Sequence, residues 1–321
     1  MRFMRLSRRL LPRKETEIMA ETKFKIVSDS CCDLPHAVIE ENGVDIVPLY
    51  VSFSDGSYLR DYYDFTYHEF YQRMIDHPGD YPKTSLPSME DYLKAWEPYA
   101  KDGVPVLSIS MTSKMSGSYN SARNAKEELL DRYPDAKIEV IDSLALTVEE
   151  GMIVLEACRL RDEGKSLAEA AEIIRTAGRR GRAYFTIGDL SYLSKGGRIG
   201  GLVKLAAVGL GLKPVILYKE GSISLSVITR SRQKSLKELA HQSAAYFISN
   251  HENPADYDLM VGYGLKQEDG EEVLQYFTEE LKAAGLSASP KLVQIGTMVG
   301  AHTGPYLMGI AMLRRYQEEK G

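Results

Sequence analysis

The sequence predicts an α/β protein of two domains, a doubly wound, mostly parallel sheet in the N-terminal half and an α+β domain in the C-terminal half. Strand-like and helix-like stretches alternate through the first half, as in a parallel sheet whose faces are covered by helices. The second half contains a hairpin with a two-residue turn, Glu220-Gly221, which is typical of an antiparallel sheet. A chain of 321 residues also exceeds the size at which one core usually stops growing.

We place the domains at residues 21–180 and 181–321. A basic joint with glycine at each end, Gly178 to Gly181, marks the boundary between them. Residues 1–20 are a different kind of sequence, rich in arginine and without the apolar core of a secretory signal. We expect this basic leader to be disordered and exclude it from the fold.

In the first domain, the apolar and β-favouring runs predict strands, and the runs rich in Ala, Glu, Leu and Arg predict helices. The strands are expected at residues 23–28, 45–53, 104–110 and 137–142, and the helices at 36–42, 66–74, 116–132, 148–161 and 166–177. Strands alternating with helices of this length predict a parallel sheet with helices on both faces.

The second domain shows a different order of elements. Strands are expected at residues 182–187, 213–219, 222–227, 257–264, 291–295 and 306–313, and helices at 231–249 and 271–284. Because two of these strands form a hairpin, the sheet is expected to be mainly antiparallel.

Composition narrows the class of protein. With 44% hydrophobic and 26% charged residues and a net charge of −5, the chain has no general attraction to nucleic acid or anionic membranes. Its three cysteines, the adjacent Cys31 and Cys32 and the distant Cys158, form no disulfide framework or metal-ligand spacing, which fits a reducing cytoplasm. The apolar run at 202–212 is interrupted by Lys204 and by glycines, so we expect no membrane span.

The stretch 108–122 is the first candidate for a functional site. It is a strand-to-helix turn dense in hydroxyl groups, and its helix is expected to open at Ser116. Free backbone N–H groups and the positive end of the helix dipole suit a carboxylate or phosphate at this position. The plainer alternative is that Ser116 only caps the helix.

Further polar segments are expected to join this turn. Ligands of parallel sheets bind beyond the carboxyl ends of the strands, where Asp29, Thr84, Ser116 and Asp142 would meet. Thr84 belongs to a polar loop at 83–88. The segment 296–305 is expected to be a polar, glycine-punctuated turn around His302, whose near-neutral pKa suits ligand contact as well as an exposed structural role.

Seven short motifs follow one another in a specific order. They are Asp29-Ser30 with Asp33-Leu34-Pro35, Thr84-Ser85-x-Pro87-Ser88, Ser113-Lys114-Met115-Ser116-Gly117-Ser118-Tyr119, Asp142-Ser143, Leu193-Ser194-Lys195-Gly196-Gly197-Arg198-Ile199, Lys213-Pro214-Val215-Ile216 and Gly300-Ala301-His302-Thr303-Gly304-Pro305. In this order they resemble the DegV family, the fatty-acid-binding proteins that serve bacteria as lipid-carrying subunits of fatty-acid kinase. The resemblance covers residues 23 to about 313.

The resemblance implies a binding site between the two domains. The tail of a long-chain fatty acid would lie in an apolar cavity, and its carboxylate would be held by Thr84 and Ser116, with Ser85 adjacent and His302 as a polar neighbour. The chain departs from the family pattern at two positions. Ser118 replaces the usual threonine and keeps the hydroxyl, whereas Tyr306 replaces a common glycine and would narrow the mouth of the cavity or add a donor there.

The resemblance also implies a protein that is not an enzyme and needs no cofactor or metal. A separate kinase in the cytoplasm would convert the bound acid to an acyl phosphate for phospholipid metabolism. Four basic residues are candidates for docking this kinase: Arg198, Lys204, Arg230 and Arg232.

Two other classes of function remain open from the residues alone. A lipid-ester hydrolase would use Ser116 or Ser113 with His302, although the Gly-x-Ser-x-Gly nucleophile pattern is absent. A regulatory or nucleic-acid-binding protein has the basic leader as its only support, because the net charge elsewhere argues against it.

Overall fold

The computed structural model describes residues 24–200 and 211–318. Its first sheet is formed by β1 (Lys25–Asp29), β2 (Val44–Val47), β6 (Val106–Ser110) and β7 (Ile138–Asp142), in the order β2-β1-β6-β7. All three strand pairs are parallel, with Val27 opposite Asp45 on one side and Ser108 on the other. The prediction of a parallel N-terminal sheet is therefore confirmed.

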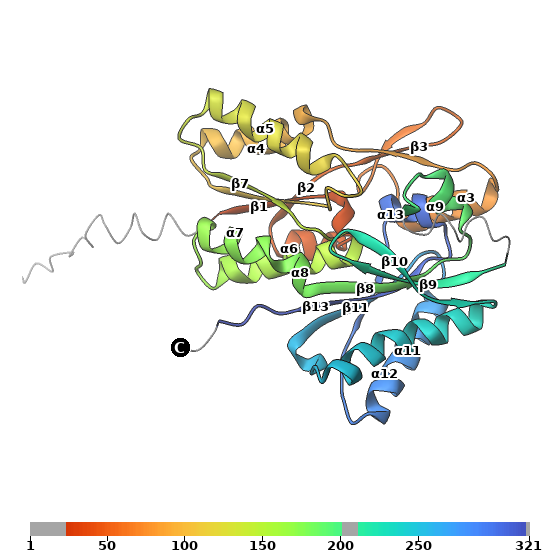
Figure 1. The fold of residues 1–321 in the computed structure, drawn as a ribbon. Coiled ribbons are helices and arrows are strands. Elements are labelled where there is room, and N and C mark those ends of the chain that lie inside the picture. Colours follow the sequence, from red (N-terminus) through yellow and green to blue (C-terminus); the bar gives the residue numbers. More distant parts are fainter. Residues whose placement is uncertain (1–23, 201–210, 319–321) are drawn as a thin grey trace, which may run out of the picture.

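Helices cover both faces of this sheet. On one face α4 (Met89–Lys101) and α5 (Ser118–Arg132) bury an apolar cluster that includes Trp96 and Leu129. On the other face lie α2 (His36–Glu41), α6 (Thr147–Asp162), α7 (Leu167–Arg175) and α8 (Ala177–Arg180). Every turn of α6 is buried because the helix packs between the two sheets, against β1 on one side and β13 on the other. Figure 1 shows these layers in succession.

The second sheet has six strands in the order β10-β9-β8-β13-β11-β12. Their bounds are β8 (Gly181–Thr186), β9 (Lys213–Lys219), β10 (Ser222–Thr229), β11 (Tyr257–Tyr263), β12 (Lys291–Gln294) and β13 (Met308–Arg314). Only the pair β11 and β12 is parallel in this sheet, so its mainly antiparallel character is confirmed. The long helices α11 (Arg232–Asn250) and α12 (Gln267–Ala283) cover its outer face around Phe247 and Phe277 (Figure 1).

A small third sheet was not expected from the sequence. The predicted strand 45–53 is wrong as one element, because Pro48 has no N–H to donate and separates β2 from β3 (Tyr50–Ser52). β3 pairs with β4 (Tyr58–Arg60) and β5 (Lys83–Ser85), and α3 (Tyr67–Asp76) packs beside them. Thr84, expected in a loop, is therefore fixed in an edge strand opposite Val51.

The segment 296–305 is also corrected, since it forms a helix, α13 (Thr297–Thr303), and not a turn. Met298 and Ala301, one turn apart, are buried in one cluster, and this packing stabilises the helix despite its glycines. Gly300 serves close packing, because a Cβ there would come within 2.5 Å of the Tyr71 hydroxyl. The short elements η1 (Ser30–Cys32), α9 (Ser191–Lys195) and η3 (Pro254–Asp256) complete the described fold.

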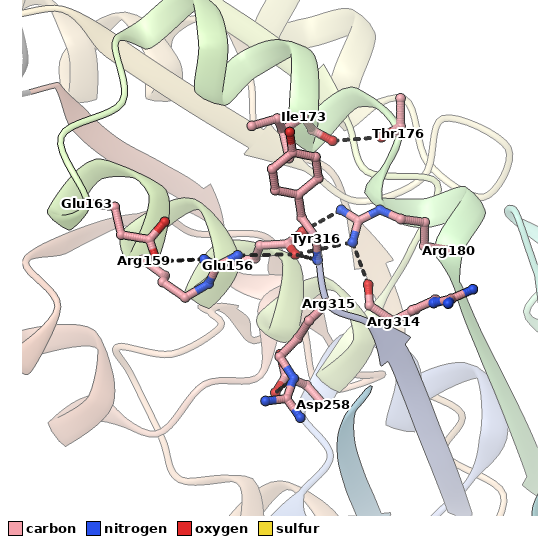
Figure 2. A network of polar contacts seen from close by, with 10 residues as sticks. All are labelled: Glu156, Arg159, Glu163, Ile173, Thr176, Arg180, Asp258, Arg314, Arg315 and Tyr316. Carbon is pink, nitrogen blue, oxygen red and sulfur yellow. Dashed lines mark hydrogen bonds and ion pairs between the residues drawn. The ribbon is translucent and has the colours of Figure 1, made fainter. Parts of the chain in front are cut away.

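A buried ion pair fixes the segment that follows β13 against α6. Glu156 is almost fully buried and receives Arg180 Nη2 at 2.6 Å, while the backbone N–H of Tyr316 donates to its other oxygen at 2.7 Å (Figure 2). The Arg180 guanidinium also donates to the carbonyl of Arg314. Because both carboxylate oxygens are bonded, the charge is compensated, and the pair joins α6, α8 and the segment after β13.

Candidate functional site

A cavity of about 380 Å³ lies between the inner face of the second sheet, α6, α13 and β5. Its volume falls within the range of small-molecule sites, and most of its lining is apolar. The sheet contributes unusually small residues to the floor of the cavity: Ala183, Gly262, Gly309 and Ala311. Ala183 and Ala311 are paired across β8 and β13, and Gly262 and Gly309 across β11 and β13, so neighbouring strands leave room together.

Three hydroxyl side chains and one imidazole are among the residues that line this cavity. Thr84, Ser85, Ser116 and His302 all line it, although they come from three segments far apart in the sequence. The Thr84 Oγ1 lies 2.9 Å from the Nε2 of His302, so β5 and α13 are joined at this point by a hydrogen bond. We refer to these four residues as the polar end.

Ser116 lies just before the helix that follows β6. The helix α5 begins at Ser118 with Gly117 as its N-cap residue, so Ser116 lies one residue before the cap position. The Ser116 Oγ accepts from the backbone N–H of Ser118 at 3.2 Å and lies 2.8 Å from the Ser118 Oγ. The N-cap residue, Gly117, has no side chain that could accept a helix N–H group, and it lines the cavity. The open N-terminus of α5 therefore faces the polar end with a positive dipole.

His302 is held as a neutral imidazole. Burial, with the nearby positive charge of Arg198, lowers its pKa from an ordinary value of 6.5 to about 4. Its Nδ1 has no hydrogen-bond partner among the described residues, and it packs against Gly196, where a Cβ would approach it to 2.2 Å. An imidazole with so low a pKa is a weak base, and it suits hydrogen bonding better than proton abstraction.

The two aspartates that were expected to meet Thr84 and Ser116 do not line the cavity. Asp29 is fully buried and accepts the backbone N–H groups of Cys31 and Met111, and burial raises its pKa to about 7. Asp142 accepts the backbone N–H of Ser113 at 3.0 Å. Both carboxylates sit at the carboxyl ends of their strands, as predicted, but there they fix the loops that carry the site.

The expectation that Tyr306 narrows the mouth of the cavity is wrong. Tyr306 lines a separate surface depression, where the Lys266 Nζ lies 5.7 Å from its ring centre and its side chain packs against Gly188. The other departure from the family pattern, Ser118, is buried at the start of α5 and keeps its hydroxyl bonded to Ser116.

The four candidate docking residues have different surroundings. Arg198 lines the cavity and donates to the carbonyl of Gly196 at 2.8 Å. Arg230 is exposed, and Arg232 is paired with Asp269 at 2.9 Å. Lys204 lies outside the described residues.

Sequence reasoning missed several polar residues in the cavity, among them Glu149 and Tyr218. Glu149, in the first turn of α6, is 1% exposed, and Tyr218 of β9 is 2% exposed. Glutamate near a helix N-terminus is ordinarily a solvated residue that complements the helix dipole, so no local signal distinguished Glu149. Only the packing of α6 between two sheets buries it.

The hydrolase alternative requires a hydrogen bond between a serine hydroxyl and His302, and these groups have other partners. Within residues 24–200 and 211–318, the His302 Nε2 contact is with Thr84, the Ser116 hydroxyl is bonded to Ser118, and the Ser113 hydroxyl is bonded to Asp142. The same residues contain no cluster of metal-ligating side chains and no helix long and apolar enough to cross a membrane.

The fold and site define an α/β protein with two large sheets, a small third sheet and a mostly apolar cavity lined by a few polar side chains, which is the usual form of a small-molecule binding site. The chain belongs to the DegV family, a family described as uncharacterised proteins, whose model matches residues 23–315.

Solved structures and curated relatives agree with this assignment. A stearic acid-binding protein from Eubacterium ventriosum is 40% identical, with a TM-score of 0.85, and the match covers 92% of this chain and 99% of that one. A fatty acid-binding DegV family protein from Thermus thermophilus is 30% identical, with a TM-score of 0.77, over 91% of this chain and 99% of the other. A DegV domain-containing protein of Clostridium acetobutylicum is 30% identical over 92% of this chain and 99% of its own length.

Proposed function

We propose that this protein binds one long-chain fatty acid, with the tail in the apolar cavity and the carboxylate at the polar end. The observation that supports the proposal is that Thr84, Ser116 and His302 line one mostly apolar cavity, with Thr84 bonded to His302. The relative from Eubacterium ventriosum, which binds stearic acid, supports the same ligand class.

The tail and the carboxylate of the fatty acid contribute different amounts of binding free energy, so they have different roles. Burying about fifteen methylene groups yields roughly 12 kcal/mol before ordering costs, at about 0.8 kcal/mol for each. A hydroxyl group bonded to a carboxylate contributes only about 1.5–3 kcal/mol. The tail therefore sets the affinity, and Thr84 and Ser116 set the position of the head group.

The polar end can bind a carboxylate through hydrogen bonds and nearby positive potential. Neutral His302 donates or accepts according to its tautomer, while Arg198 and the N-terminus of α5 supply positive potential nearby. Hydroxyl donors bind a carboxylate without the two parallel bonds of an arginine fork, so one oxygen stays available for chemistry. This arrangement suits a carrier that offers its ligand to another protein.

We further propose that the partner is the catalytic subunit of a fatty-acid kinase in the cytoplasm, which makes the acyl phosphate. Phosphoryl transfer needs phosphate and metal sites, and the glycine-rich stretch at 193–201 matches neither nucleotide fingerprint. Three basic residues of the described chain, Arg198, Arg230 and Arg232, with Lys204, are the candidates for this contact.

Lipid extraction tests the binding proposal. Protein purified without detergent is expected to release one long-chain fatty acid per chain, measured by mass spectrometry of the extract and of the intact native protein. Delipidated protein is expected to take up added stearic acid to the same stoichiometry. A protein that carries no acid and takes up none would contradict the proposal.

A further inference from the structure

Glu149 places a carboxyl group in the wall of the apolar cavity. The residue is 1% exposed and lines the cavity from the first turn of α6. A Cβ built on Gly181 would lie 2.2 Å from its Oε1, so the carboxyl group rests on the first residue of β8. Glycine at 181 leaves the space that this side chain occupies.

Glu149 and His302 lie toward opposite ends of β8, because Glu149 rests on Gly181 whereas His302 packs against Gly196, beyond the end of this strand. β8 runs from Gly181 to Thr186, and Thr186 pairs with Met308, the strand residue that follows α13 and His302. At about 3.3 Å per residue, the two ends of β8 are about 16 Å apart. An acid held by its carboxylate at Thr84 would therefore present the distal half of its chain to Glu149.

Neither carboxyl oxygen of Glu149 has a hydrogen-bond partner among the residues described. The cation that acts on it is Arg182, whose guanidinium stacks over Tyr246 at 3.7 Å on the opposite face of the sheet. Burial raises the pKa of Glu149 well above its ordinary range, so the group is a neutral acid with one O–H to donate. A buried donor without a partner in the chain is costly, so it favours an acceptor supplied by water or by a ligand.

Tyr218 adds a second polar atom to the cavity wall. Its hydroxyl donates to the carbonyl of Leu144 at 2.9 Å and is also hydrogen-bonded to the side chain of Thr112. Tyr218 of β9 is the strand partner of Ala183 of β8, which lies two residues after Gly181. Because the Tyr218 hydroxyl is bonded within the chain, Glu149 provides the unpartnered polar group beside Ala183 and Ala311 in this part of the cavity.

We propose that Glu149 is a specificity-determining residue for an acyl chain that carries an oxygen, as a hydroxyl or keto group, in its distal half. This inference rests on the proposed fatty-acid binding. A plain hydrocarbon tail leaves the Glu149 donor unpaired, whereas an oxygenated tail accepts its hydrogen bond. The same bond repays the cost of moving the chain oxygen out of water.

Competition among three acids tests the proposal on the delipidated protein. The probes are stearic acid, stearic acid with a hydroxyl on its twelfth carbon, and stearic acid with a hydroxyl next to the carboxylate. We expect the wild-type protein to prefer the distal hydroxy acid over both others. In Glu149→Leu the ratio of its affinity to that of stearic acid is expected to fall by about tenfold or more.

Two further variants separate recognition from structure. Glu149→Gln keeps a donor and an acceptor and is expected to retain the preference. Glu150→Gln changes the neighbouring buried carboxyl, which is bonded to Ser28 and does not line the cavity, and is expected to leave the ratio unchanged. If Glu149→Leu does not fold, the wild-type preference and Glu149→Gln decide the question.

The outcomes distinguish the two proposals. A wild-type protein that binds stearic acid but does not prefer the distal hydroxy acid overturns the role of Glu149 and leaves fatty-acid binding intact, as does an unchanged ratio in Glu149→Leu. A protein that binds none of the three acids overturns the proposed function itself.

Discussion

Replacing Thr84 and Ser116 together by alanine is expected to lower the affinity for stearic acid by at least about a hundredfold. Each lost hydroxyl removes a hydrogen bond to the carboxylate worth about 1.5–3 kcal/mol, so the pair accounts for about 3 kcal/mol or more. The apolar cavity is left unchanged, and the expected loss therefore belongs to the head group. Titration of delipidated protein with stearic acid measures it.

A matched double variant controls for this result. Ser224→Ala with Thr278→Ala removes the same two kinds of hydroxyl from β10 and α12, where neither residue lines the cavity. Its affinity is expected to equal that of the wild-type protein. If Thr84→Ala with Ser116→Ala binds stearic acid as tightly as this control, the polar end does not hold the carboxylate.

The second large effect is a pH dependence of stability that belongs to His302. Its pKa is about 4 in the folded protein, below the ordinary 6.5 of an unfolded chain. As the pH falls from 6.5 to 4, the unfolded state binds a proton that the folded state does not, and the folded state loses up to about 3 kcal/mol. Above pH 6.5 this contribution is fully present.

The comparison with His302→Gln isolates the effect. Raised carboxyl pKa values, such as that of Asp29, change stability with pH in both proteins and cancel in the difference. Between pH 6.5 and 4, denaturant unfolding should show the wild-type protein losing stability relative to the variant. Parallel profiles, or an imidazole NMR titration of His302 near pH 6.5, would contradict the burial of a neutral ring.

The sequence predicted the two larger sheets well but not the small third one, because the signals of the larger sheets are local. Alternating apolar runs and turn residues are enough to place β1, β6 and β7 and the β9–β10 hairpin. Pro48 is also a local signal, and reading it as a strand breaker would have separated β2 from β3. The helix α13 could not be found in this way, since its glycines indicate a turn and only packing against Tyr71 and neighbouring side chains makes it helical.

The residues of the site also divide into those with a local sequence signal and those without one. Hydroxyl-rich motifs identified Thr84, Ser85, Ser116 and His302, and the structure brings all four to one cavity. The resemblance selected them; spacing alone would have added Asp29 and Asp142, which fix loops instead. Glu149 was missed because only its burial in the folded protein makes it a cavity residue. The small residues of the cavity floor were missed because only strand pairing brings them side by side.

A crystal structure of the delipidated protein soaked with stearic acid tests the central claim most directly. The account predicts the carboxylate within hydrogen-bonding distance of the Thr84 and Ser116 hydroxyls and the tail lying over Ala183 and Ala311. A stearate in the reverse orientation, with its head group at Glu149, or an empty cavity at saturating stearic acid, would contradict it.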